Sequence, residues 1–250
     1  MNILLSGFCG FMGKEVIKLC ENNYENCKVV CGVDAFCNGE ESVPCFKTFS
    51  EVNVEVDCIV DFSFHTVTKS LLEYAVSKNI PVVLCTTGHT DDEKQLIYDA
   101  SKNIPIFYSA NMSIGVSLLV ELAKKTASVM GGTDIEIIEK HHNRKVDAPS
   151  GTALMIFEGL KEVRPNAVAV MGRSGQSKRA DCNEVGIHSL RMGNVVGEHE
   201  VIISSNNQTI TLKHEAHNRG LFAEGALVAV NFITKQKTAG IYNMKNMLNG

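Results

Sequence analysis

The sequence predicts an α/β protein with two domains: a doubly wound parallel sheet, and an inserted α+β domain that carries a mixed, largely antiparallel sheet. Over the first 110 residues, short apolar segments alternate with longer amphipathic ones, a pattern typical of parallel strands joined by helices. Beyond residue 130, apolar and polar residues alternate with period two, which is typical of strands with one solvated face. The 250 residues are enough for one large or two modest domains.

Five segments of the first domain are predicted to be buried parallel strands, because they are short, apolar and rich in β-branched residues. They are Asn2–Ser6, Val29–Val33, Cys58–Phe62, Val82–Cys85 and Ile104–Tyr108. The amphipathic segments between them predict helices over Gly10–Asn22, His65–Ser77 and Asp91–Ser101. Pro81 and Pro105 each follow a predicted helix and open the next strand, which marks two boundaries.

A helix predicted over Ser113–Met130 separates the two kinds of pattern. After it, period-two strands are predicted at Asp134–His142, Gly186–Met192, Glu198–Ser204 and Thr209–His214, and the last three are close enough in sequence to pair antiparallel. A helix over Gly151–Glu162 and a polar loop over Arg173–Glu184 lie among them, and an apolar helix over Leu221–Ile233 is expected to return to the first domain. The predicted domains are therefore 1–112 with 220–250, and 113–219.

Charge and hydropathy exclude several classes of protein. The 24 basic and 28 acidic residues give a net charge of −4, so neither nucleic acid nor an anionic membrane is an expected partner. The sequence has no apolar stretch of about 18 residues and no signal-peptide pattern, which predicts a cytoplasmic protein.

The nine cysteines are an odd number, and eight of them lie before residue 86. No C-x-x-C pair exists, and the nearest approach, Cys27 with Cys31, has no second pair at zinc-finger spacing. We therefore expect reduced thiols that pack as small apolar side chains, and no metal site.

A glycine-rich turn, Gly7-Phe8-Cys9-Gly10-Phe11-Met12-Gly13, follows the first strand and opens the first helix. Its spacing is a variant of the dinucleotide-binding fingerprint, in which glycines permit a tight turn and the close approach of a pyrophosphate. Asp34 ends the second strand, where a carboxylate can accept hydrogen bonds from an adenosine ribose. No Arg or Lys adjoins Asp34, which favours NADH over NADPH. A glycine-rich turn without a ligand is the alternative.

Two further loops lie at the carboxyl ends of strands, where ligands of open α/β sheets bind. They are Cys85-Thr86-Thr87-Gly88 and Ser109-Ala110-Asn111-Met112. Their small and amide side chains would allow close approach of a nicotinamide and its ribose, although ordinary loop chemistry explains them as well.

The most informative segment runs from a strand end through a basic loop into a helix, and it contains His141, His142, Arg144 and Lys145. Four potentially cationic groups within five residues favour an anion. The following Ser150-Gly151-Thr152 supplies backbone N–H groups at a helix N-terminus, a second anion-binding feature. A bound carboxylate or phosphate, with Lys145 or a histidine as proton donor, makes a coherent active site. The alternatives are packed histidines, a solvated charged face and a simple Ser150 N-cap.

Residues 141–153 resemble the signature of the 4-hydroxy-tetrahydrodipicolinate reductase (dihydrodipicolinate reductase) family, and the resemblance extends over nearly the whole chain. It implies a Rossmann-like cofactor domain and a substrate-binding and tetramerisation domain. The implied reaction is NAD(P)H-dependent reduction of 4-hydroxy-tetrahydrodipicolinate to tetrahydrodipicolinate with loss of water, in the diaminopimelate route to lysine. A homotetramer and a cyclic dicarboxylate substrate are the implied partners.

The resemblance also assigns roles to residues. It implies that His141 is the acid/base histidine, Lys145 the proton donor, His142 a substrate contact, and Gly151 with Thr152 the grip on a substrate carboxylate. The implied cofactor contacts are Gly7, Phe8, Cys9, Gly10, Phe11, Met12, Asp34, Cys85, Thr86, Thr87, Ser109, Ala110, Asn111 and Met112. Phe11, Cys85 and Met112 depart from residue types common in the family. Two rivals remain: another two-domain NAD(P)-dependent amino-acid or semialdehyde dehydrogenase, and a non-catalytic dinucleotide sensor with redox-active cysteines.

Overall fold

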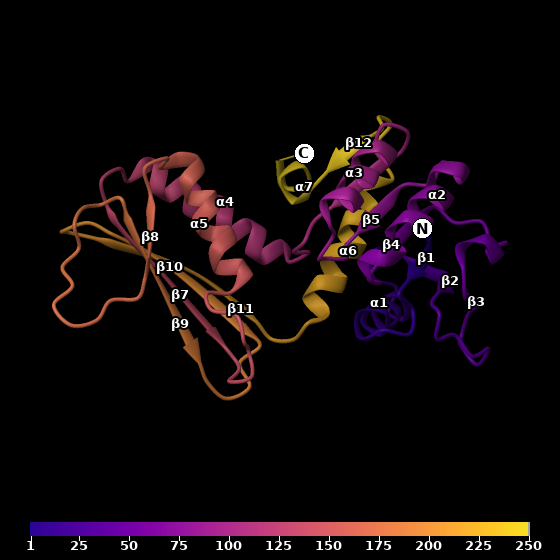
Figure 1. Cartoon of the computed structure of the whole chain (residues 1–250), viewed down its shortest axis with the longest axis horizontal. Helices are drawn as coiled ribbons and strands as arrows, with labels where there is room; N and C mark the ends of the chain where they lie inside the picture. The colour runs from indigo at the N-terminus through magenta and orange to yellow at the C-terminus, as the bar shows by residue number, and fades with distance from the viewer. Residues whose placement is uncertain (250) are drawn as a thin grey trace. The chain divides into compact units, whose positions relative to one another are not determined.

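The computed structural model describes residues 1–249 and divides into two compact units (Figure 1). The first unit joins residues 1–113 with residues from 220 onward, and the second is Ile114–Arg219. These boundaries lie beside the ones expected from the sequence. The roles predicted for the two domains are treated below as proposals.

The first unit is built on a seven-stranded parallel sheet in the order β12-β6-β5-β4-β1-β2-β3. Its strands are β1 (Asn2–Ser6), β2 (Lys28–Val33), β3 (Cys45–Phe46), β4 (Cys58–Asp61), β5 (Val82–Leu84), β6 (Pro105–Tyr108) and β12 (Gly240–Tyr242). The five predicted strands are present, and Ile3, Leu4 and Leu5 of β1 are fully buried. The crossover order confirms the doubly wound, Rossmann-like class.

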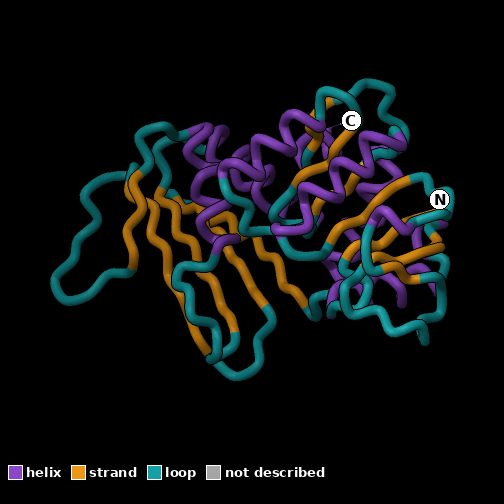
Figure 2. The backbone as a smooth tube through the Cα atoms, turned by 45° about the vertical axis from the view of Figure 1, so that its right-hand side comes forward, coloured by secondary structure: helices purple, strands orange, loops and turns teal. Residues whose placement is uncertain are grey.

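Helices flank this sheet on both sides, as the tube drawing in Figure 2 shows. They are α1 (Phe11–Glu21), α2 (Thr68–Lys78), α3 (Asp91–Ala100), α6 (Gly220–Ile233) and α7 (Met244–Asn249), with 3-10 turns at Tyr24–Asn26, Phe49–Glu51 and His65–Val67. Local sequence sets their ends: Thr90 and Glu93 form a capping box at the start of α3, and Asn79 ends α2 in the left-handed conformation. Helix α6 packs against α1 and β5, so the chain does return to the first unit.

The second unit is one mixed sheet with the order β11-β10-β7-β9-β8. Its elements are α4 (Ile114–Val129), β7 (Asp134–His141), α5 (Gly151–Val163), β8 (Val168–Met171), β9 (Glu184–Arg191), β10 (Gly197–Ser204) and β11 (Thr209–Ala216). Alternate residues of β7 and β10 are buried, and α4 and α5 pack on that face.

The strand neighbours in this sheet differ from the expectation for the last three strands. Strand β10 pairs antiparallel with β11 and with β7, but β9 lies on the far side of β7 and runs parallel to it. Among the described strands the sheet therefore has two antiparallel and two parallel pairings. A buried carboxylate on β7, Glu139, binds Arg191 of β9, and period-two patterning carries no information about such a partner.

Three short strands were not predicted. β3 has two residues, β12 has three, and β8 has four of which two are exposed, so none carries a buried run or a clear alternation. Within residues 1–249, no helix is long and apolar enough to cross a membrane. The cytoplasmic location stays a prediction.

One pair of cysteines departs from the expectation of reduced thiols. Cys37 and Cys45 form a disulfide, with their Cα atoms 5.9 Å apart. The parallel pairing of β2 with β3 brings the two together, because Gly32 of β2 lies opposite Cys45. Of the remaining cysteines, Cys27, Cys31, Cys58 and Cys85 are buried, as expected for small apolar side chains.

Candidate active site

The glycine-rich turn joins the end of β1 to the start of α1. Gly7 has a φ of +79°, and a Cβ there would lie 2.6 Å from the carbonyl oxygen of Phe62. A Cβ on Gly13 would lie 2.4 Å from the carbonyl oxygen of Gly7. Only glycine fits these two places, so the turn brings bare backbone to the carboxyl end of the sheet, where a pyrophosphate can approach it.

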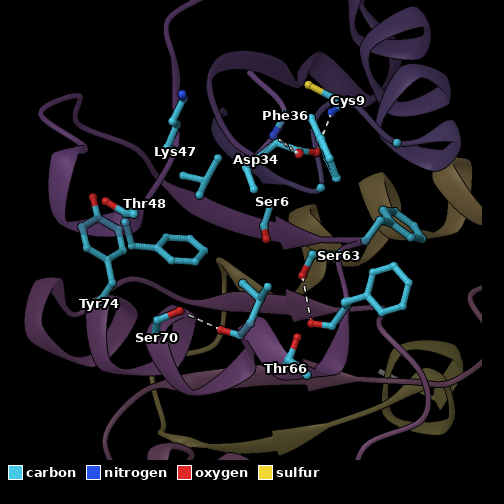
Figure 3. Close-up of a pocket in the computed structure, with 18 of the residues that line it drawn as sticks. Ser6, Cys9, Asp34, Phe36, Lys47, Thr48, Ser63, Thr66, Ser70 and Tyr74 are labelled. Carbon is cyan, nitrogen blue, oxygen red and sulfur yellow. Dashed lines mark hydrogen bonds between the residues drawn. The ribbon is translucent and has the colours of Figure 1, made fainter. Parts of the chain in front are cut away.

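Asp34 follows β2, and its carboxylate is hydrogen-bonded to the backbone of the glycine-rich turn. One carboxylate oxygen accepts a hydrogen bond from the backbone N–H of Cys9 at 2.9 Å, and the other accepts one from the N–H of Phe36 at 3.0 Å (Figure 3). Each oxygen has a second lone pair, so the carboxylate can still accept a ribose hydroxyl. The half-buried position of Asp34 leaves it open to the cleft described next.

A cleft of about 1020 Å³ opens beside the turn and Asp34. Figure 3 shows side chains around it from several loops, including Lys47, Thr48 and Ser63, and from helix α2, including Tyr74. Lys47 is the one basic side chain among the described residues that line it. The cleft has the size of sites for large organic ligands. With the glycine turn and the carboxylate at one end, it fits a dinucleotide.

A smaller cavity of about 270 Å³ lies in the same unit. It is lined by Met12, Phe62, Ser63, Cys85, Thr86, Thr87, Ala110, Met112 and Phe222. The buried carboxylate of Asp61 fixes one wall, since it accepts hydrogen bonds of 2.6 Å from both the Ser63 and the Thr86 hydroxyls. The two loops expected near the nicotinamide therefore meet here.

The fourteen predicted cofactor residues divide into three groups in the structure. Gly7, Cys9, Gly10 and Asp34 line the large cleft, and Met12, Cys85, Thr86, Thr87, Ala110 and Met112 line the smaller cavity. The remaining four, Phe8, Phe11, Ser109 and Asn111, line neither. Phe8 is buried against Gly32, and the Ser109 hydroxyl donates a hydrogen bond to the Asn111 carbonyl, whereas the Phe11 side chain is 60% exposed.

In the second unit, His141 lies at the end of β7 and contacts the fully buried carboxylate of Glu139. The Nδ1 atom of His141 lies 2.5 Å from Glu139, two residues earlier on the same face of the strand. Arg191 of β9 donates two hydrogen bonds of 2.8 Å to the same carboxylate. Burial alone would raise the pKa of Glu139, but the hydrogen bonds led by Arg191 hold it at about 2. Glu139 is therefore an anion that orients the imidazole.

Ser150 connects this carboxylate to the start of helix α5. Its backbone N–H donates to Glu139 at 3.1 Å, and its hydroxyl caps the helix by accepting from the N–H of Ala153 at 3.2 Å. The same hydroxyl lies 3.0 Å from Nε2 of His199, whose pKa burial lowers to about 4. The ring of His199 packs edge-on to His141. The neutral His199 thus supports both the cap and the strand-end histidine.

His142 and Lys145 occupy the loop beyond β7. The Nδ1 atom of His142 is buried and has no hydrogen-bond partner within the described chain. Burial, followed by nearby cations such as Arg144, lowers the pKa of His142. The Lys145 ammonium lies 2.8 Å from Asp147, and the Lys145 N–H donates to the His142 carbonyl. A Cβ added at Gly151, the first residue of α5, would meet nothing within 4 Å, so the helix start is open.

The structure thus brings the predicted substrate-site residues onto one strand end, one loop and one helix start. Sequence reasoning gave no catalytic-site role to Glu139, Arg191 or His199, and it missed Lys47 and Asp61 in the first unit. Glu139 carried a usable signal, because an acidic residue two before His141 shares its face of an alternating strand. The others come from distant segments and gave no local signal.

Two family models match the chain. One is described as dihydrodipicolinate reductase, N-terminus, and matches residues 1–112; the other, dihydrodipicolinate reductase, C-terminus, matches residues 115–248. The 4-hydroxy-tetrahydrodipicolinate reductase of Clostridium tetani is 45% identical, with 100% of this chain and 97% of that protein covered. The protein of the same name from Clostridium novyi is 43% identical, with coverages of 98% and 97%.

Solved structures agree with this assignment. A dipicolinate-bound dihydrodipicolinate reductase from Paenisporosarcina sp. TG-14 matches with a TM-score of 0.82 and 25% identity, covering 97% of each chain. A probable dehydrogenase from Thermotoga maritima, at 9% identity and a TM-score of 0.64, shares the fold alone. The chain belongs to the dihydrodipicolinate reductase family.

Proposed function

We propose that this protein is the NAD(P)H-dependent reductase that converts 4-hydroxy-tetrahydrodipicolinate to tetrahydrodipicolinate with loss of water, in the diaminopimelate route to lysine. Family membership supports the reaction. The observation in the structure that carries the proposal is His141, held on the buried Glu139 carboxylate beside a basic loop and an open helix start. That arrangement suits an anionic substrate that needs a proton.

The first unit is proposed to bind the dinucleotide. The glycine turn would take the pyrophosphate, Asp34 the adenosine ribose, and the cavity lined by Thr86 and Met112 the nicotinamide end. When bound, the dihydronicotinamide would supply a hydride to the ring carbon from which the 4-hydroxyl is lost as water, so that the C=N bond is kept in the product.

The second unit is proposed to bind the cyclic dicarboxylate and to supply protons. The open start of α5 at Gly151 and Thr152, together with His142, would hold a carboxylate. Hydride addition leaves negative charge on the substrate, and the Lys145 ammonium would donate a proton to it. His141 would act as acid/base: its Nδ1–H donates to Glu139, which leaves Nε2 to exchange a proton.

The other two-domain dehydrogenases explain the glycine turn equally well, but not the His-His-x-x-Lys to Ser-Gly-Thr segment. The dinucleotide sensor gives no role to the open start of α5. Neither rival is favoured by a specific observation.

We propose that NADH is favoured slightly over NADPH. Asp34 can accept the ribose hydroxyls of NADH, and Lys47, which lines the same cleft, offers a cation to a 2′-phosphate and explains why NADPH would also be accepted.

We also propose a homotetramer assembled through the second sheet. The strands of that sheet expose apolar side chains at Val168, Met171, Leu190 and Ile210, with Val168 and Met171 each 58% exposed. Assembly through this sheet would remove these exposed apolar side chains from water.

Replacing the proposed proton donors tests the reaction. Lys145→Ala and His141→Ala should each lower kcat by about 10²- to 10⁴-fold with 4-hydroxy-tetrahydrodipicolinate as substrate, because general acid–base catalysis is worth that much. Steady-state kinetics at saturating NADH measures the effect, and Lys161→Ala on the exposed part of α5 is the control. Near-wild-type kcat in both site variants would sink the assignment.

Replacing Glu139 tests its charge. Its pKa lies at about 2 in the folded protein, below the value of 4.5 for an unperturbed Glu, so its stabilising effect is present above pH 4.5 and is lost as the pH falls towards 2. Glu139→Gln should lower the free energy of unfolding by about 2–4 kcal/mol near neutral pH, with the difference shrinking as pH falls through about 4. Urea denaturation at several pH values measures this.

The control for that experiment is Glu158→Gln, since Glu158 is an exposed partner of Lys161 and should change stability by less than about 0.5 kcal/mol. A Glu139→Gln difference that stays constant from neutral to acid pH would contradict an ionised Glu139.

Lys47→Ala tests the cofactor preference. It should raise KM for NADPH about tenfold and leave KM for NADH within about twofold, because only NADPH carries the 2′-phosphate. The wild type should show a kcat/KM for NADH at or above that for NADPH. A strong NADPH preference that survives the substitution would show that Asp34 and Lys47 do not set the choice.

The tetramer is tested by sedimentation velocity. The wild type should sediment as four chains, and the double variant Val168→Glu, Met171→Glu should dissociate, because charge on an apolar interface is costly to bury. Leu96→Glu, at an exposed apolar position of α3 in the first unit, is the matched control. A wild type that sediments as a monomer refutes the proposal.

A further inference from the structure

Four metal-binding groups converge in the first unit, outside the substrate site. The sulfurs of Cys9, Cys37 and Cys45 and one carboxylate oxygen of Glu41 all lie within 4.8 Å of one another. Cys9 belongs to the glycine turn, Cys37 follows β2, and Cys45 begins β3. Cys37 is buried and the other three are half-buried, so a small ion can reach the cluster from solvent.

Backbone hydrogen bonds hold these groups in place. The N–H of Cys9 donates to Asp34, and the N–H of Cys37 donates to the Asp34 carbonyl at 3.2 Å. The Glu41 carboxylate accepts backbone hydrogen bonds of 2.7 and 2.9 Å from the two residues after Cys37. Ligating carboxylates in metal sites are commonly oriented by hydrogen bonds of this kind, and each oxygen keeps a lone pair for a metal.

We propose that, in the reduced protein, Cys9, Cys37, Cys45 and Glu41 bind one Zn²⁺. Three thiolates with one carboxylate is a donor set that zinc accepts in tetrahedral geometry. With Zn–S bonds of about 2.3 Å, tetrahedral donors stand roughly 3.8 Å apart. The four groups lie within 4.8 Å of one another, and reduction of the disulfide frees the Cys37 and Cys45 sulfurs to separate to that distance. The disulfide uses two of the four groups, whereas a metal would use all four.

Charge in the neighbourhood favours a cation. The carboxylates of Asp34 and Glu41 lie near the Cys9 thiol, and the Lys14 ammonium is an opposing charge. A divalent cation held by the thiols would be attracted by both carboxylates and would stabilise the bound thiolates. The sequence pattern gave no indication of the site, since its ligands span 37 positions and include no C-x-x-C pair.

The proposed ion would connect the turn that carries Cys9 to the segment from Cys37 to Cys45. Both ends of this link flank Asp34, so the ion would stiffen the rim of the large cleft. The metal site itself does not depend on the proposed function, because it is defined by residues and measured without turnover.

The test uses the full-length protein after reduction. Dithiothreitol supplies the two electrons and two protons that convert the Cys37–Cys45 disulfide to thiols and is itself oxidised to its cyclic disulfide. After removal of the reductant and of metal with a chelator under anaerobic conditions, the protein is titrated with Co²⁺ and then with Zn²⁺. We expect one ion per chain, with the thiolate-to-cobalt charge-transfer absorption and the intense visible bands of a tetrahedral site, both lost when Zn²⁺ is added.

Cys45→Ser and Glu41→Gln are the site variants, and Cys182→Ser, at a free half-buried cysteine of the second unit, is the matched control. We expect Cys45→Ser to weaken Zn²⁺ binding at least a hundredfold and Glu41→Gln at least tenfold, with Cys182→Ser unchanged. Circular dichroism shows which variants fold, and Glu41→Gln alters only a loop side chain. Thiol titration first confirms that Cys37 and Cys45 are free thiols, and the proposal is overturned if the wild type in that state binds Zn²⁺ no more tightly than Glu41→Gln.

Discussion

The buried carboxylate of Glu139 is the interaction on which the second unit depends. A fully buried anion is costly unless charge and hydrogen bonds compensate it, and here the compensation comes from three different elements: Arg191 on β9, His141 on β7 and the Ser150 N–H at the start of α5. One carboxylate therefore fixes the position of β9 beside β7, the start of α5 and the orientation of the His141 imidazole. The proposed acid/base residue His141 and the proposed carboxylate site at the start of α5 therefore both depend on the Glu139 carboxylate.

Much of the fold followed from local pattern, and the exceptions have identifiable causes. The five predicted parallel strands of the first unit carry apolar runs that only a sheet covered on both faces can bury. β3 and β12 are two and three residues long, too short for any period to show. The predicted position of β9 was wrong because β9 pairs with the distant strand β7, where Arg191 bonds Glu139 across 52 positions of sequence. Alternation specifies which face a strand buries and leaves its neighbour open.

The candidate site also combines residues that a local sequence pattern predicts with residues that only the fold brings together. The glycine turn, Asp34 and the His141 to Thr152 segment are continuous patterns whose chemistry can be read from spacing. Lys47 and Asp61 are ordinary residues in sequence, and they gain meaning only when the loops at the carboxyl ends of neighbouring strands meet around a cavity. Glu139 is an intermediate case. The alternation of β7 predicts that Glu139 shares a face with His141, but nothing in the sequence predicts its hydrogen bonds with Arg191.

The first unit is made from two stretches of chain separated by a complete second unit, and this affects the order of synthesis. Strand β12 closes one edge of the parallel sheet against β6, and α6 packs on α1 and β5. During translation the first 113 residues lack both partners until more than a hundred further residues have been made, whereas the second unit emerges as one continuous piece. The parallel sheet of the first unit is therefore begun first on the ribosome and completed last. Its apolar surface is the one exposed longest to chaperones and proteases.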